Sequence, residues 1–200
     1  GFYVVRLGSK KMNKFNLKNQ NFFDYSNSKI KSDSMDLFFI KYSEFFIGTQ
    51  SGMLDVANMF KKPVFLTNMC ELYANPPLKE KDMGIFKSVY DVKTKKKLSL
   101  EKYSRLPFKF HNPDNDIKEY FFKENSDEKI LRAVKRFIKN LYSKKITNSN
   151  YENKFKDKIK KNLQILYQKK NDNQNNLKKF RDCIRFVRKV KTFEGFICFS

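Results

Sequence analysis

The fold of this chain is decided by one stretch, Glu44-Phe-Phe-Ile-Gly-Thr-Gln-Ser-Gly-Met-Leu-Asp-Val-Ala-Asn-Met-Phe-Lys-Lys-Pro-Val-Phe-Leu-Thr-Asn68. The apolar run 45–47 predicts a strand, and the small residues that follow predict a turn. Apolar residues then recur at helical spacing from Met53 to Phe60. Pro63 cannot continue a helix, and the apolar residues after it predict a second strand. The stretch therefore predicts one βαβ unit and an α/β fold.

The turn between this strand and this helix suits an anionic ligand. Gly48 and Gly52 lack the Cβ that would keep a ligand from the backbone amides, and the free N–H groups at the start of the helix favour a negative charge. We therefore predict a diphosphate site here. Its candidate binding residues are Gly48, Thr49, Gln50, Ser51 and Gly52. The alternative is that Gly and Ser only make a tight connection, with Ser51 as the N-cap of the helix.

A second candidate lies near the start of the sequence, where the run 2–5 predicts a buried strand. Arg6 and Gly8 follow at its carboxyl end, where ligands bind in open α/β sheets. A guanidinium at this place would neutralise a diphosphate through paired hydrogen bonds. The alternative is a surface arginine at a turn.

Ser32 precedes a predicted helix over residues 34–42. Together with Asp33 and Asp36 it is typical of an N-cap followed by an acidic first turn. A contact of these residues with a ribose or a sugar is the alternative, and we favour the cap. Residues 78–97 are polar and interrupted by Gly84, which predicts a long surface excursion from the sheet.

The chain of 200 residues is strongly basic, with a formal net charge of +22. The charge is uneven, since residues 126–200 carry 21 Lys and Arg against 7 Asp and Glu. A basic surface of this size attracts polyanions or an anionic membrane surface. The shift in composition also predicts a domain boundary after residue 125.

Beyond this boundary the sequence predicts helices. Asn125 followed by Glu128 has the form of a capped helix start, and the apolar residues that follow predict an amphipathic helix of about 16 residues. A second apolar stripe runs from Phe155 to Leu166, whereas the segment 181–188 fits a helix or a strand. We therefore expect an α/β domain over residues 1–125 and a basic helical appendage over residues 126–200.

The basic helices allow two interpretations. Their apolar stripes can pack on the α/β core or on a further half of the protein while the lysines stay in water, which we favour. Alternatively, the helices lie on an anionic membrane surface. Nucleic acid is not favoured as a partner, because Phe and Tyr fall at core spacing and the sequence contains no recognisable binding motif.

The remaining residues with reactive side chains are few. Cys70, Cys183 and Cys198 are widely spaced, which predicts neither a disulfide framework nor a metal site and favours a reducing cytoplasm. His111 is the single histidine and sits in a polar context, so we do not assign it as a catalytic base. The sequence contains no run of 18 apolar residues that would predict a membrane-spanning helix.

Several short motifs occur in an order that resembles a family of bacterial glycosyltransferases of the GT-B type, distantly similar to fucosyltransferases and heptosyltransferases. The resemblance covers roughly residues 1–110 and extends faintly to Gly195-Phe-Ile-Cys198. The motifs that carry it are Phe2-Tyr-Val-Val-Arg-Leu-Gly8, Asp24-Tyr25, Ser32-Asp-Ser-Met-Asp36, Gly48-Thr-Gln-Ser-Gly52 and Lys62-Pro-Val-Phe-Leu-Thr-Asn68.

The resemblance implies a Rossmann-like parallel sheet that forms the C-terminal, donor-binding half of a GT-B fold. It implies a sugar nucleotide as substrate and no bound metal or other cofactor. The expected partners are the nucleotide-sugar donor, a glycan or lipid-linked acceptor, and an N-terminal half of the same protein. The upstream motif that bears His and Arg in relatives has no counterpart here, so no catalytic residue is assigned and we expect this chain to be inactive alone.

The resemblance and the composition together predict a cytoplasmic protein, with peripheral contact to the inner face of the membrane as a further expectation. Two other functions remain open. A sugar-nucleotide epimerase has the same two-half architecture and would act on the donor alone. A non-enzymatic basic protein would bind polyanions without binding nucleotides.

Overall fold

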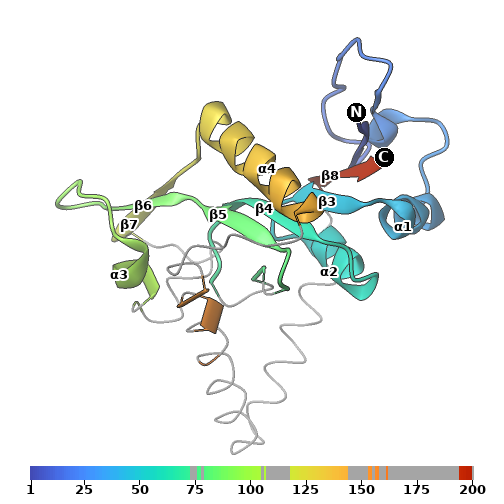
Figure 1. The fold of residues 1–200 in the computed structure, drawn as a ribbon. Coiled ribbons are helices and arrows are strands. Elements are labelled where there is room, and N and C mark those ends of the chain that lie inside the picture. The colour runs from blue at the N-terminus through green and yellow to red at the C-terminus, as the bar shows by residue number, and fades with distance from the viewer. Residues whose placement is uncertain are drawn as a thin grey trace, which may run out of the picture.

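A computed structural model describes residues 1–72, 76–77, 79–104, 106, 118–143, 153–154, 156–157, 161 and 194–199. These residues form an α/β structure with a six-stranded sheet of order β2-β1-β8-β3-β4-β5 (Figure 1). The α/β fold class predicted from the sequence is therefore confirmed. The strands of this sheet are β1 (Tyr3–Gly8), β2 (Phe22–Phe23), β3 (Phe45–Gly48), β4 (Val64–Met69), β5 (Met83–Phe86) and β8 (Glu194–Phe199). The main helices are α1 (Asp33–Tyr42), α2 (Gly52–Met59), α3 (Leu100–Ser104) and α4 (Asp127–Tyr142).

The βαβ unit predicted from the deciding stretch is confirmed as β3, α2 and β4. β3 and β4 pair in parallel, with Phe46 opposite Val64 and Gly48 opposite Leu66. Lys61 follows α2 in a left-handed backbone conformation with φ 56°, and Pro63 then leads into β4. The chain can reverse direction here because the helix ends at Met59, four residues before the proline.

β8 is the main departure from the expected parallel sheet. It runs antiparallel between β1 and β3, so that Gly195 pairs with Leu7 on one side and with Gly48 on the other. The sheet is therefore mixed, and the expectation of purely parallel strands is wrong at this position. The sequence stretches before and after residue 125 contribute to one sheet.

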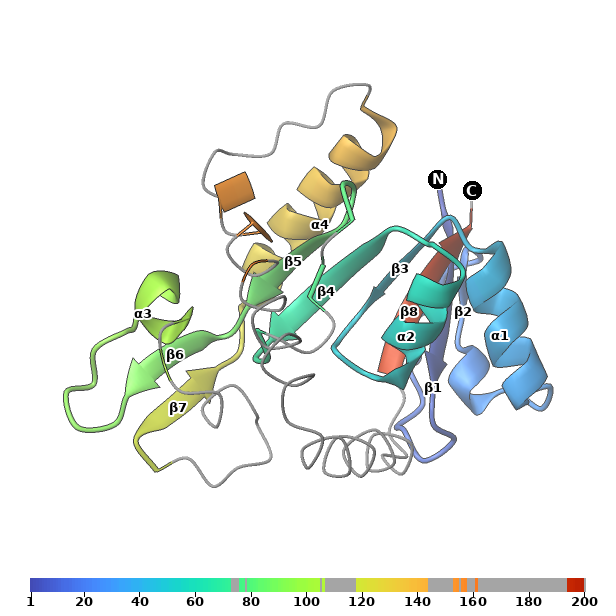
Figure 2. The same cartoon turned by 90° about the horizontal axis from the view of Figure 1, so that it is seen from below.

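The large sheet is covered by helices on both faces, as Figures 1 and 2 show. Alternate residues of each strand point to opposite faces. Phe46 and Val64 lie in the core beneath α1 and α2, whereas Phe45 and Phe65 lie in the core beneath α4. Two apolar layers therefore hold the sheet between its helices.

α4 packs on the sheet rather than forming a separate appendage. The Phe137 ring is fully buried, and its centroid lies 5.4 Å from that of Phe45 and 5.6 Å from that of Phe65. The interpretation that the apolar stripe of this helix packs on the α/β core is therefore confirmed. The other predicted elements of the basic region, the stripe from Phe155 to Leu166 and the segment 181–188, lie largely or wholly outside the described residues.

The predicted cap of α4 is wrong by one residue. Ser126 is the N-cap, and its Oγ accepts a hydrogen bond of 3.4 Å from the backbone N–H of Lys129. Asn125 is instead buried, because its side chain bonds to residues of the sheet. A serine is as good a cap as an asparagine, so the sequence allowed either residue.

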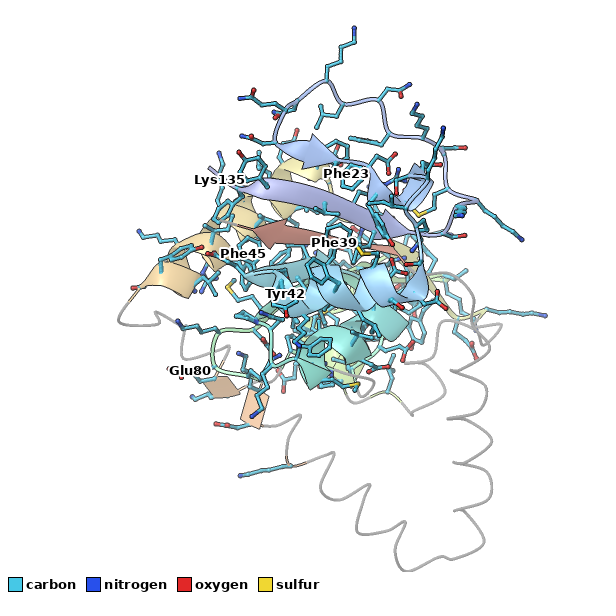
Figure 3. All side chains as sticks on the ribbon, turned by 90° about the vertical axis from the view of Figure 1, so that its right-hand side faces the viewer. Phe23, Phe39, Tyr42, Phe45, Glu80 and Lys135 are labelled. Atoms are coloured by element: carbon cyan, nitrogen blue, oxygen red, sulfur yellow. The ribbon has the colours of Figure 1, made fainter. Side chains whose placement is uncertain are left out.

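The predicted cap of α1 is confirmed. The Ser32 Oγ accepts a hydrogen bond of 3.3 Å from the backbone N–H of Met35. Asp36 forms an ion pair of 2.5 Å with Lys31, and this pair occupies the carboxylate. The inner side of α1 packs through Phe39, labelled in Figure 3, against the fully buried ring of Tyr25.

The expectation of a surface excursion over residues 78–97 is wrong. Residues 83–86 form β5 at the edge of the large sheet, and β6 (Ser88–Asp91) pairs antiparallel with β7 (Tyr120–Lys123) in a separate two-stranded sheet. One face of that ribbon packs with α3 through Val89, Tyr103 and Phe122. The sequence signal for these strands was the apolar residues at alternate positions within an otherwise polar segment.

Candidate functional site

The candidate site lies at the carboxyl edge of the large sheet, where β1 and β3 end. Gly8 ends β1 and pairs with Glu194, while Gly48 ends β3 and pairs with Gly195. β8 thus lies between the strands of the two predicted glycines, so that β1 and β3 are about 10 Å apart. The structure brings Gly8 and the turn 48–52 to the same edge, as the sequence predicted, although β8 between them was not foreseen.

Ser51 occupies the N-cap position of α2 but does not cap the helix through its side chain. Its backbone is extended, with φ −137° and ψ 172°, and its carbonyl accepts the first helical hydrogen bond from Leu54 at 2.9 Å. Its Oγ is buried and has no hydrogen-bond partner among the described residues. A buried hydroxyl without a partner is costly, so this group is suited to bind a ligand oxygen.

Gln50 holds the turn to the segment that follows β4. Its Nε2 donates a hydrogen bond of 2.7 Å to the carbonyl of Glu71, and its Oε1 accepts hydrogen bonds from the backbone N–H groups of Cys70 and Glu71 at 3.2 and 3.1 Å. Both ends of the amide are therefore engaged within the protein. This geometry makes Gln50 a residue that positions the turn.

Replacing Gln50 by alanine should lower the free energy of unfolding by about 1–3 kcal/mol, because it leaves half-buried backbone groups of Cys70 and Glu71 without these partners. Chemical denaturation measures the loss, and hydrogen exchange should increase at the amides of those two residues. Asn58→Ala, in the same helix region, is a control that keeps the turn intact. Unchanged exchange at both amides would contradict the positioning role.

The other residues of the turn have simpler surroundings. Thr49 and Gly52 are half-buried, and Gly48 is buried. The Gly48 carbonyl accepts a long hydrogen bond of 3.4 Å from the Thr67 Oγ1 of the neighbouring strand. Ser51 is thus the residue of the predicted set with a buried hydroxyl group that no described residue bonds to.

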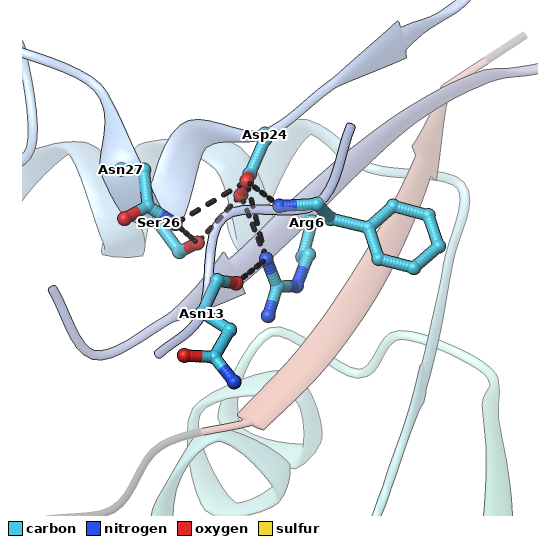
Figure 4. A network of polar contacts seen from close by, with 6 residues as sticks. Arg6, Asn13, Asp24, Ser26 and Asn27 are labelled. Atoms are coloured by element: carbon cyan, nitrogen blue, oxygen red, sulfur yellow. Dashed lines mark hydrogen bonds and ion pairs between the residues drawn. The ribbon is translucent and has the colours of Figure 1, made fainter. Parts of the chain in front are cut away.

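Arg6 is placed differently from the sequence-based expectation. It lies inside β1 and is 7% exposed, and it forms a buried ion pair of 3.1 Å with Asp24 (Figure 4). Its Nη1 also donates a hydrogen bond of 3.0 Å to the carbonyl of Asn13. By the alternation of the strand, Arg6 lies on the face opposite to Val5 and Leu7, which pack in the core with α2. Arg6 therefore ties the loop 9–21 to β1.

Asp24 is the centre of this network. It accepts hydrogen bonds from the Ser26 Oγ at 2.6 Å and from the backbone N–H of Phe15 at 2.9 Å, besides the contact with Arg6. Burial raises the pKa of Asp24, but these hydrogen bonds and the charge of Arg6 outweigh burial and hold the pKa below its usual value. The carboxylate is thus ionised and structural.

Sequence reasoning missed a polar cluster at the end of β4. Asn68 has a left-handed backbone with φ 49° at a register shift between β4 and β5, and its Oδ1 accepts two hydrogen bonds from Asn125, at 2.9 and 2.7 Å. Its Nδ2 donates to Glu124, which also pairs with Lys87. The signal in the sequence was an asparagine two residues after the apolar run that ends at Leu66, since Asn tolerates this conformation better than most residues.

No family model, no curated protein and no solved structure gives a significant match to this chain. Within the part of the chain that the structure describes, no group of three His, Cys, Asp or Glu side chains is arranged to hold a metal ion. The same residues include no helix that combines the length and the apolar character needed to cross a membrane. His111 lies outside the described residues.

Proposed function

We propose that this chain is the nucleotide-sugar-binding part of a GT-B type glycosyltransferase, with a Rossmann-like arrangement of its parallel strands. The observation that carries the proposal is the turn 48–52, which joins β3 to α2 at the carboxyl edge of the sheet. It contains the buried Ser51 hydroxyl, for which the described part of the chain offers no hydrogen-bond partner. Crevices at this edge are where open α/β sheets bind nucleotides. The motif resemblance described above supports the same reading.

In this proposal the diphosphate of the donor lies against the turn. Gly48 and Gly52 allow the phosphate oxygens to approach the backbone, Thr49 and Ser51 offer hydroxyl groups, and the positive end of α2 favours the negative charge. The same groups would stabilise the diphosphate as it leaves the sugar. Lys10 and Lys11, two exposed residues that follow Gly8 and Ser9, would supply cations at this edge, since Arg6 is already paired with Asp24.

The reaction we propose is transfer of a sugar from a nucleotide diphosphate to a glycan or a lipid-linked acceptor. The chain would work with an N-terminal half that makes most, but not all, of the contacts with the acceptor, in the cytoplasm or at the inner face of the membrane. Neither a metal nor another cofactor is part of the proposal. No described residue is assigned as the catalytic base.

Replacing Gly52 by valine tests this site. The added branched side chain at the first position of α2 should obstruct the approach of a phosphate and weaken nucleotide diphosphate binding by about tenfold or more, equivalent to about 1.4 kcal/mol. Calorimetric titration of the folded chain with UDP, GDP, ADP and CDP measures the affinity. Nucleosides without phosphate should bind about equally to both proteins.

Met59→Val is the matched control, because it places the same side chain at the exposed end of the same helix. It should bind nucleotides like the wild type. If Gly52→Val keeps full affinity, the turn does not hold the diphosphate. If the wild type binds none of the four nucleotides, the proposal of a donor site is wrong.

A further inference from the structure

The small β6–β7 sheet presents a row of aromatic and basic side chains on one face. Tyr90 of β6 lies opposite Phe121 of β7, and Lys97 pairs with Tyr90 from the other side through a single bridge. Directly opposite residues share a face of a sheet. Lys123 lies on the same face, two residues beyond Phe121, and the Lys95 Nζ lies over the Phe121 ring at 5.9 Å from its centroid. We call Tyr90, Lys95, Lys97, Phe121 and Lys123 the β6–β7 platform.

The platform faces away from the core of this ribbon. The opposite face carries Val89 and Phe122, which pack with Tyr103 of α3, and α3 lies on that side of the ribbon in Figure 1. Phe121 is 42% exposed, although most aromatic side chains of this size are found buried. Lys95, Lys97 and Lys123 are all exposed. The platform thus combines an exposed aromatic side chain with three exposed cations.

A further lysine, Lys129, lies close to Lys97 of the platform. Burial, together with the charge of Lys97, lowers the pKa of Lys129 at the start of α4. Glu119 directly precedes β7, two residues before Phe121, and its single negative charge leaves the three lysines of the platform in excess. A concentration of like charges raises the local potential and favours an anionic partner.

The arrangement of the rings indicates which kind of anion fits. The Tyr90 and Phe121 rings are stacked on each other, with centroids 5.1 Å apart and an angle of 12° between their planes. Tyr90 therefore covers one face of the Phe121 ring, and the Lys95 Nζ also lies over that ring, so Phe121 offers little open ring face. Nucleic-acid bases bind aromatic residues through open ring faces. Ring edges carry the positive end of the quadrupole and attract oxygen atoms.

We propose that the β6–β7 platform binds an anionic glycan, whose carboxylate and hydroxyl oxygens contact the lysine ammonium groups and the ring edges. The proposal rests on the proposed function, because it gives the acceptor of the glycosyltransferase a chemical class. The lysines would pair with the acidic groups through charge-assisted hydrogen bonds. Stacking between Tyr90 and Phe121 would keep the two ring edges in place.

The test uses the whole chain and polygalacturonate oligosaccharides, an acidic glycan of simple composition. The double variant Lys95→Gln and Lys97→Gln should lose about tenfold or more in affinity, equivalent to about 1.4 kcal/mol. The matched control is Lys14→Gln and Lys18→Gln, which removes the same charge from exposed positions in the loop after β1. The control should stay within about twofold of the wild type, because distant exposed charges are largely screened.

Two further probes decide the class of partner. Fully methyl-esterified oligosaccharide has the same sugar chain without the charge, and it should bind at least about tenfold more weakly. Single-stranded poly(dT) should bind more weakly than polygalacturonate at equal salt. Phe121→Ala should weaken glycan binding while circular dichroism remains that of the wild type.

The outcomes separate this proposal from the donor site. Equal losses in both lysine double variants, equal binding of the esterified glycan, or tighter binding of poly(dT) would each overturn the glycan platform. Loss of glycan binding in the platform variants with unchanged UDP titration supports it. Glycan binding as expected in a protein that binds no nucleotide would support the platform and overturn the proposed donor site.

Discussion

Phe137→Ala should lower the free energy of unfolding by about 3–5 kcal/mol, because the removed ring is fully buried between α4 and the sheet. Alanine keeps the helix but leaves a cavity against Phe45 and Phe65. Urea denaturation followed by circular dichroism measures the change. Stabilities of small domains are often only 5–15 kcal/mol, so such a loss is a large part of the total.

Leu131→Ala is the control for this prediction, since Leu131 lies on the same helix and is 53% exposed. It should change stability by about 0.5 kcal/mol or less. If both variants are equally mild, α4 does not pack on the sheet in solution. A large loss in Phe137→Ala alone shows that the basic helix is part of the α/β core.

Arg6→Leu should cost about 3–5 kcal/mol at neutral pH, because it leaves the Asp24 carboxylate without its cation in a buried position. The side chains of Arg6 and Asp24 are only 8% and 11% exposed, so water replaces the lost partner poorly. Lys14→Leu, an exposed substitution in the adjoining loop, should leave stability within about 0.5 kcal/mol of the wild type. An equally small loss in Arg6→Leu would show that the ion pair contributes little.

The same pair sets a dependence on pH. The pKa of Asp24 in the folded protein lies below its ordinary value of 3.8, so its contribution to stability is present above about pH 4 and is lost as the pH falls through the folded pKa. The penalty of Arg6→Leu should therefore shrink as the medium becomes acidic, because a protonated Asp24 needs no cation. Urea denaturation at neutral and at acid pH, with Asp24→Asn as reference, measures this difference.

The βαβ unit could be predicted from the sequence because its signals are local. A strand-sized apolar run, small residues in the turn and the helical spacing from Met53 to Phe60 lie within 25 consecutive residues. The packing of α4 was also visible, because its apolar stripe fits a sheet face. The cap of that helix was misplaced by one residue, since Asn125 and Ser126 have the same propensity.

The parts that were missed depend on contacts between distant residues. Nothing local to residues 194–199 indicates that they pair with β1 and β3, because strand pairing is set by tertiary packing. Arg6 at the end of an apolar run is as compatible with a ligand as with an ion pair. Its partner, Asp24, lies 18 residues away and became apparent only in the folded chain.

The central place of β8 has a consequence for how the protein is made on the ribosome. The ladders β1–β2 and β3–β4–β5 can form early, but each keeps an unpaired edge until residues 194–199 arrive. Such contacts of high sequence separation form slowly, and open edges invite pairing with other chains in the meantime. A nascent chain of this protein therefore carries two unpaired strand edges from the synthesis of β5 until that of β8, and it should bind chaperones that act near the ribosome exit during this interval.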